Sequence, residues 1–130
     1  MQIAETHGPQ MDVWPTELRV SKDRRTLTVS FNDGAAHVLP AELLRVHSPS
    51  AEVQGHSPAQ RQLVGGKRNV EIMKLEPVGN YAVRITFDDM HDTGLFSWAY
   101  LAKLGREKEA LWAAYLKELE GAGKTRDPAR

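Results

Sequence analysis

The five histidines of this chain are the side chains best suited to hold a metal or to transfer a proton near neutral pH. They are His7, His37, His47, His56 and His91. No two of them stand four residues apart, the helical spacing with which many zinc enzymes hold their metal, so the pattern predicts no zinc motif. His91 lies among the aspartates of segment 88–92. A weak metal site made by His91, one of these carboxylates and either His47 or His56 is one alternative. A structural turn histidine is the other.

Three serines near the middle of the chain are candidate nucleophiles. Ser48, Ser50 and Ser57 have no neighbouring base in a recognisable motif, and no G-x-S-x-G sequence surrounds them. A small enzyme that uses the histidines and the aspartates of segment 88–92 is a second alternative. Spacing alone, however, pairs no nucleophile with a base. We therefore predict no catalytic residue.

The segment 45–68 carries an excess of positive charge. Its partner-binding candidates are the basic side chains of Arg45, Arg61, Lys67 and Arg68 and the histidines His47 and His56, which add charge at mildly acid pH. Such a loop can receive an acidic protein surface or a phosphate. Alternatively, it is solvated and its charges are balanced by the aspartates of segment 88–92. Because no aromatic side chain lies in the segment to stack on a base, nucleic acid is not the predicted partner.

The composition of the 130 residues narrows the class of protein. Seventeen basic residues balance seventeen acidic ones, so net charge gives no argument for binding to nucleic acid or to a membrane surface. The absence of cysteine excludes disulfides, thiolate zinc sites and a cysteine nucleophile. No apolar run approaches the ~18 residues of a membrane-spanning helix, and the polar N-terminus lacks the pattern of a signal sequence. We therefore expect a cytoplasmic protein.

Periodicity and turn residues predict one domain over residues 14–120, with flexible tails at 1–13 and 121–130. Alternating apolar residues predict a three-stranded antiparallel meander at the start of this domain and a hairpin over 70–87. The predicted helices occupy residues 40–46, 97–104 and 107–120, and a long loop occupies 48–68. A loop of that length inside a compact domain is more often functional than neutral.

Side-chain patterns predict which faces are buried. Four alternate residues in the second strand of the hairpin are apolar and are expected on one buried face. They are Tyr81, Val83, Ile85 and Phe87. In the last helix, Leu111, Tyr115 and Leu119 recur at every fourth position and are expected to pack on the sheet. Together these patterns predict a single α+β domain. Its one mixed or antiparallel sheet, made of the meander and the hairpin, is covered by the C-terminal helices.

Two long strings in the chain are similar to those of a known family. They are LRVHSPSAEVQGH at 44–56 and VEIMKLEPVGNYAVRITFDDMHDTGLFSWAYL at 70–101. With these strings the chain resembles, over about residues 14–105, the gamma-butyrobetaine hydroxylase-like N-terminal domain family, also called DUF971, in its stand-alone bacterial form. The resemblance implies a small α+β domain with a mixed or antiparallel sheet.

The hydroxylases of the family hold a structural zinc, and the resemblance implies which residues of this chain occupy the positions of its ligands. Their three cysteine ligands fall on Ser48, Ser50 and Val53 of this chain, and their histidine ligand falls on His91. Two hydroxyls and an aliphatic side chain cannot replace three thiolates, so we expect no metal here. The two segments that meet at the zinc in those relatives are nevertheless expected to be neighbours in this chain.

The function implied by the resemblance is that of an accessory domain. The oxygenase chemistry of the hydroxylases belongs to a separate domain, so no cofactor is expected in this one. We expect a non-catalytic interaction domain that serves an iron–sulfur or oxygenase system. Its partner is expected to be a protein, neither nucleic acid nor a membrane, and to contact the 45–68 loop and the 88–94 turn.

Overall fold

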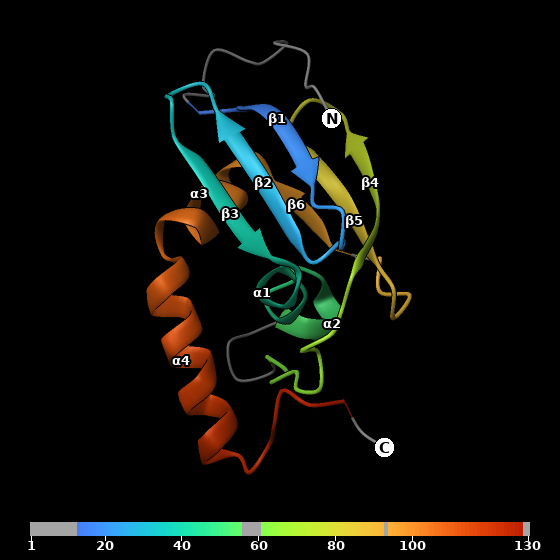
Figure 1. Ribbon diagram of the computed structural model, residues 1–130, viewed down its shortest axis with the longest axis vertical. Helices are drawn as coiled ribbons and strands as arrows, with labels where there is room; N and C mark the ends of the chain where they lie inside the picture. The colour runs from blue at the N-terminus through green and yellow to red at the C-terminus, as the bar shows by residue number, and fades with distance from the viewer. Residues whose placement is uncertain (1–12, 56–60, 93, 129–130) are drawn as a thin grey trace.

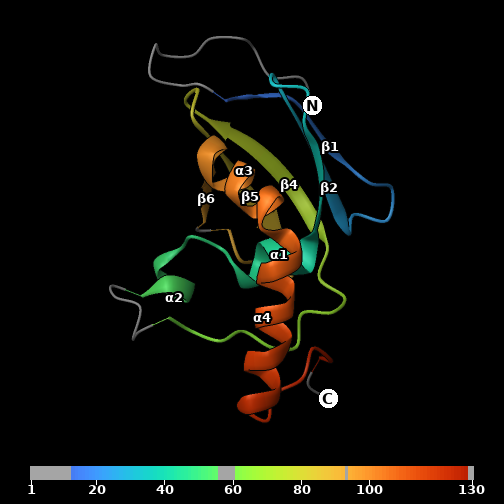
Figure 2. The same cartoon turned by 90° about the vertical axis from the view of Figure 1, so that its left-hand side faces the viewer.

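The computed structural model describes residues 13–55, 61–92 and 94–128. Within these ranges the chain forms two three-stranded antiparallel sheets and four helices, so the α+β class is confirmed. Almost all of the predicted N-terminal tail, together with His7, His56 and Ser57, lies outside the described residues. In Figure 1 one sheet lies in front of the other, and in both Figures 1 and 2 the last helix extends beyond the sheets toward the C-terminus.

The first sheet is the predicted meander. It consists of β1 (Pro15–Val20), β2 (Thr26–Phe31) and β3 (Ala36–Pro40), with β2 in the centre. Alternation places Leu27 and Val29 in the core, and both are fully buried. The first turn contains Arg24 in the left-handed region at φ 63°, and the second contains Gly34 at φ 89°.

The second sheet contains the predicted hairpin and a strand that the sequence patterns do not predict. It consists of β4 (Ile72–Val78), β5 (Ala82–Phe87) and β6 (Leu95–Ser97), with β5 in the centre. Val83, Ile85 and Phe87 are fully buried as predicted. The prediction for Tyr81 is wrong. It lies in the turn before β5 and is 50% exposed.

The meander and the hairpin do not form the one continuous sheet that we predicted. A backbone hydrogen bond of 2.8 Å runs from the Ile72 amide to the Arg24 carbonyl, but β4 pairs only with β5 and the two sheets stay separate. They share one apolar core nonetheless, to which both sheets and the third helix contribute. Its members include Leu27, Val29, Ile72, Ile85 and Leu101. The two sheets are therefore joined by side-chain packing rather than by a strand ladder.

The four helices are α1 (Ala41–Val46), α2 (Ala51–Gln54), α3 (Trp98–Arg106) and α4 (Lys108–Gly121). Ser97 caps α3, because its hydroxyl accepts a 3.1 Å hydrogen bond from the Tyr100 amide. Helix α3 continues through Gly105, beyond the predicted end of this helix at residue 104. None of the described helices is both long enough and apolar enough to cross a bilayer.

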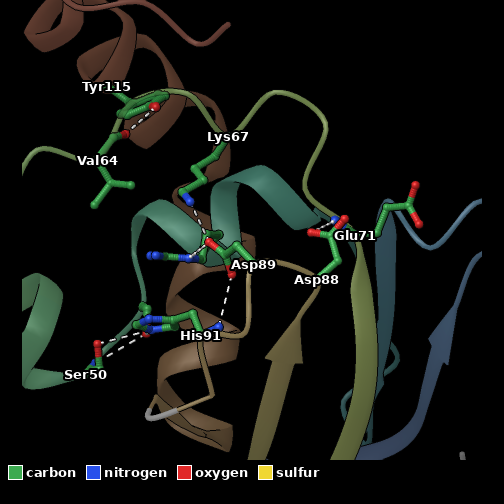
Figure 3. Close-up of polar contacts among 10 residues, drawn as sticks. Ser50, Val64, Lys67, Glu71, Asp88, Asp89, His91 and Tyr115 are labelled. Atoms are coloured by element: carbon green, nitrogen blue, oxygen red, sulfur yellow. Dashed lines mark hydrogen bonds and ion pairs between the residues drawn. The ribbon is translucent and has the colours of Figure 1, made fainter. Parts of the chain in front are cut away.

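The last helix, α4, packs differently from the prediction. Tyr115 and Leu119 are buried, but they pack in a small cluster with Val46 at the end of α1 and with half-buried Leu63 and Val64, not on a sheet. The Tyr115 hydroxyl donates a 2.7 Å hydrogen bond to the Val64 carbonyl, as Figure 3 shows. Leu111 is only half-buried. Helix α4 therefore holds residues 61–64 of the long loop in place.

The chain beyond α4 contacts the rest of the domain. The Gly66 and Arg68 amides donate hydrogen bonds of 2.9 and 3.0 Å to the carbonyls of Thr125 and Arg126. Arg126 also forms two hydrogen bonds, of 2.9 and 2.7 Å, with the buried carboxylate of Glu42. Part of the segment 121–130, which we predicted to be a free tail, is therefore attached to α1 and to the loop.

Candidate functional site

Two segments that are far apart in the sequence meet at a cluster of buried polar side chains. His91 Nε2 lies 2.9 Å from Ser48 Oγ and 3.3 Å from Ser50 Oγ. The serines lie between α1 and α2, and His91 follows β5. Figure 3 shows the contact between Ser50 and His91. The expectation that these two segments are neighbours is therefore confirmed, and we call Ser48, Ser50 and His91 the polar junction.

The polar junction is closed to solvent. Ser48, Ser50 and His91 have only 0%, 4% and 7% of their surfaces exposed. A Cβ atom on Gly94 would collide with the Ser48 hydroxyl and crowd Pro49, so only glycine allows the chain to approach this closely. Buried hydroxyls and imidazoles cost stability unless they are hydrogen-bonded, and these three satisfy one another.

Asp89 joins the same two segments through charge. Its Oδ2 accepts hydrogen bonds of 2.8 Å from Arg45 Nε and 2.6 Å from Lys67 Nζ, and its Oδ1 accepts one of 3.1 Å from the His91 amide. Figure 3 shows Lys67 and His91 on either side of Asp89. Burial disfavours the charged carboxylate, but the hydrogen bonds from Lys67 and Arg45 outweigh burial and lower the pKa of Asp89 to about 2. Asp89 is therefore ionised at neutral pH.

The turn around Asp89 presents one apolar side chain to solvent. Met90 is 79% exposed and lies in the left-handed region at φ 69°. A non-glycine residue in that region carries backbone strain, which persists only where neighbouring contacts impose it. Hydrogen bonds between Asp88 and Glu71, of 2.9 and 3.1 Å, hold the other side of the turn. Sequence reasoning did not single out Met90. Its signal is that it is the one apolar residue in an otherwise polar segment, 88–92.

The predicted partner-binding cations that the structure describes form ion pairs within the domain. Arg45 and Lys67 both bind Asp89, Arg61 pairs with Glu118, and Arg68 Nε lies 2.6 Å from Asp127 Oδ1. His47 is half-buried, and burial, followed by the charge of Arg61, lowers its pKa. The aspartates of segment 88–92 were expected to balance the positive charge of segment 45–68. Asp89 does so directly through its ion pairs with Arg45 and Lys67. The role of these side chains in partner binding stays a prediction.

The side chains at the positions of the family's zinc ligands do not fit zinc. Ser48 and Ser50 offer neutral hydroxyls, and Val53, which is 2% exposed, offers no donor atom. Across the described ranges, no three His, Asp or Glu side chains converge in a way that would hold a metal ion. His91 therefore acts here as a hydrogen-bonding group of the polar junction.

The pair of Ser48 and His91 has the separation of a nucleophile and its base, which spacing in the sequence did not reveal. Ser48 is nevertheless completely buried, so a substrate cannot reach its hydroxyl in this conformation. Such a pair stabilises the contact between the two segments.

Comparison with solved structures finds close relatives. Two solution NMR structures are 50% and 45% identical to this chain, each with a TM-score of 0.78. The first match covers 90% of this chain and 92% of its relative, and the second covers 96% and 94%. A crystal structure from Acidithiobacillus ferrooxidans, of a protein of unknown function in the DUF971 family, is 38% identical with a TM-score of 0.59. That match covers 70% of this chain and 91% of the relative.

Comparison with family models gives a consistent result. The model described as gamma-butyrobetaine hydroxylase-like, N-terminal, matches residues 18–102. No protein in the curated set matches this chain. The matched residues include most of both strings, 44–56 and 70–101, on which the resemblance rests. The chain therefore belongs to the gamma-butyrobetaine hydroxylase-like N-terminal domain family.

Proposed function

We propose that this domain is a non-catalytic interaction domain that presents the turn Asp88–Met90 to a protein partner. The observation that carries the proposal is the position of Met90, which is 79% exposed at the tip of a strained but well-anchored turn. Strained backbone that neighbouring contacts hold in place is concentrated at functional sites. A methionine side chain adapts its shape to an apolar pocket on a partner.

The anchors of the turn support this role. Asp89 is bound by Arg45 and Lys67 from one segment, and the adjacent His91 is bound by the serines of the polar junction. These contacts fix the backbone on both sides of Met90 before a partner arrives. A pre-ordered turn loses less conformational entropy on binding than a mobile one does.

The surface beside the turn supplies polar groups for recognition. A hollow of about 270 Å³ lies between segment 66–69 and the turn, and Lys67, Asn69 and Asp88 are among the residues that line it. We call the turn Asp88–Met90 and this hollow the contact face. An apolar contact surrounded by charged and amide groups is the usual arrangement at the centre and rim of a protein interface.

The partner that we propose is a protein of an iron–sulfur or oxygenase system, as the family resemblance implies. The non-catalytic part of the proposal is supported by the closed polar junction. There the hydroxyl nearest to a histidine is fully buried. The domain would therefore contribute binding while another protein or domain performs the chemistry.

Affinity purification from the native cell with three forms of the protein tests this proposal. Met90→Gly removes the exposed side chain at a backbone angle that glycine adopts without strain, so the variant is expected to fold. Met73→Ala is the control, because Met73 is 54% exposed on β4, outside the contact face. Proteins that co-purify with the wild type and with Met73→Ala, but are depleted at least about fivefold with Met90→Gly, are the expected result. Equal recovery with all three forms would overturn the proposal.

A further inference from the structure

A second site lies away from the contact face, between α3, α4 and the chain that follows α1. It is a cleft of about 440 Å³. This volume is in the range of roughly 300–1,000 Å³ found for small-molecule sites. Its wall includes His47 at the end of α1, Arg61 from the long loop, Tyr100 and Lys103 from α3, and Glu118 from α4. None of the residues of the contact face lines it.

Polar groups converge on the cleft with an excess of positive charge. Arg61 pairs with Glu118 across it, and Lys103 adds a second cation from α3. The Nε2 atom of His47 is buried and has no hydrogen-bond partner among the described residues. The Tyr100 hydroxyl holds the His47 backbone by donating a 2.5 Å hydrogen bond to its carbonyl. Two cations and a neutral histidine therefore face a single carboxylate.

The remainder of the wall is apolar. Leu104, Leu111 and Ala114 line the cleft from α3 and α4. Leu104 is 1% exposed and belongs to the main core, so this wall is rigid. A ligand that fills the cleft thus meets hydrocarbon on one side and positive charge on the other.

We infer that this cleft binds a small organic carboxylate that carries a short apolar chain. The carboxylate head pairs with Arg61 and Lys103, and the chain lies against Leu104, Leu111 and Ala114. A guanidinium binds a carboxylate through two parallel hydrogen bonds, which makes Arg61 the principal anchor.

Binding requires Arg61 to exchange Glu118 for the ligand. Both side chains of this pair are about one-third exposed, at 32% and 38%. An ion pair with that exposure is screened by water and contributes little to stability, so the exchange costs little. Lys103, for which the described residues provide no ion pair, gains a partner when the ligand binds.

Titration with hexanoate, followed by ¹H–¹⁵N NMR spectra of the full chain, tests this inference. We expect saturable shifts of the signals from His47, Arg61, Lys103 and Ala114. Hexylamine has the same number of carbon atoms with the opposite charge, and inorganic phosphate has negative charge without the chain. Neither is expected to produce the same saturable shifts. Equal binding of hexylamine would show that charge is not recognised and would overturn the inference.

Two pairs of variants localise the site. Ala114→Leu fills the cleft, whereas Ala113→Leu adds the same side chain at the neighbouring exposed position, which does not line it. Lys103→Gln removes a cation of the cleft, and Lys117→Gln removes an exposed one outside it. We expect Ala114→Leu to raise the Kd for hexanoate at least about tenfold and Lys103→Gln to raise it several-fold, while the controls leave it unchanged. Hexanoate binding that survives Ala114→Leu unchanged would place the ligand elsewhere and contradict the inference.

Discussion

Asp89 is the residue that most directly couples the long loop to the turn after β5. It is the shared acceptor for Arg45, which lies on α1, and for Lys67, which precedes β4. Its side chain is 21% exposed, so water screens these ion pairs only in part. The low pKa of Asp89, about 2, is the electrostatic signature of this arrangement.

The pKa of Asp89 predicts an acid-dependent loss of stability. The carboxyl has a pKa of about 2 in the folded protein and an ordinary value of 3.8, so its charge stabilises the fold above pH 3.8. That stabilisation is lost as the pH falls toward 2. Asp89→Asn lacks this group. In denaturant titrations, the difference in unfolding free energy between wild type and variant should therefore narrow by about 1 kcal/mol from about pH 5 to about pH 2. A difference that does not change with pH would show that Asp89 is not stabilised by its partners.

Gly105 is a second residue whose identity the packing explains. Replacing a helical glycine by alanine normally stabilises a protein by up to about 1 kcal/mol. A Cβ atom at position 105, however, would collide with the imidazole ring of His37 on β3. Gly105→Ala should therefore lower the unfolding free energy by about 1–3 kcal/mol.

The control for Gly105→Ala is the same substitution made in a protein that lacks the His37 ring. In a His37→Ala protein the ring is gone, so Gly105→Ala should be neutral or stabilising when both are measured by denaturant titration. The same loss in both backgrounds would mean that His37 is not the obstacle.

The polar junction and the cleft between α3 and α4 differ in how far the sequence could predict them. Ser48, Ser50 and His91 were grouped by the family resemblance, and the structure brings them within hydrogen-bond distance. Spacing alone could not pair them, because 43 residues separate Ser48 from His91. The cleft had no such guide. Residues of α3, α4 and the long loop line it. These segments are far apart in the sequence, so no local sequence pattern predicts that they meet.

The strands were predictable where alternation runs for several residues. Val83, Ile85 and Phe87 satisfy the pattern because they belong to the central strand β5 and face the shared core. Tyr81 continues the pattern in the sequence but lies in the turn, where alternation no longer has structural meaning. The strand β6 has only three residues, too few for a periodic signal, and is defined by its pairing with β5.

Aspartate substitutions at Val83 and Tyr81 test which of these two residues faces the core. Val83 is fully buried, so Val83→Asp buries a charge with no partner and should abolish the cooperative thermal transition. Tyr81→Asp places the same charge on a half-exposed residue and should leave that transition in place. A cooperative melt of Val83→Asp near the wild-type temperature would mean that the register of β5 is wrong.

The segment after α4 acts as a strap across α1. Arg126 binds the carboxylate of Glu42, which is 5% exposed, and its guanidinium lies 4.9 Å from the centre of the Trp112 ring. Arg126→Ala leaves that carboxylate buried without its partner, so we expect an unfolding free energy lower by about 2–4 kcal/mol. Arg126→Lys keeps the charge but loses the second hydrogen bond and much of the contact with the Trp112 ring. Its unfolding free energy should therefore lie between those of the wild type and Arg126→Ala.

The control for the strap is a pair at the surface. Arg68 and Asp127 are 44% and 63% exposed, so Arg68→Ala should cost less than about 0.5 kcal/mol in the same denaturant titration. Equal losses for Arg68→Ala and Arg126→Ala would mean that burial of Glu42 does not decide the stability of the strap.

The domain as a unit is assembled from contacts between distant parts of the chain. Two sheets share a core without sharing a strand, α4 covers α1 and the loop, and the C-terminal segment returns to α1. Apolar periodicity indicates which face of each strand is buried but not which strands pair. The number of sheets therefore could not be predicted from the sequence, although the α+β class and the C-terminal helices could.

Thermal melting tests whether the chain's own side chains hold the polar junction together. One sample is melted in excess EDTA, and a second is melted without EDTA in the presence of one equivalent of zinc. Ser48, Ser50 and His91 satisfy one another there, so the wild-type midpoint should be the same under both conditions. The triple variant Ser48→Cys/Ser50→Cys/Val53→Cys restores cysteine at the three positions of the family's zinc ligands and is the positive control, whose midpoint should rise with zinc. A wild-type midpoint that rises saturably with one equivalent of zinc would contradict a junction made only of protein hydrogen bonds.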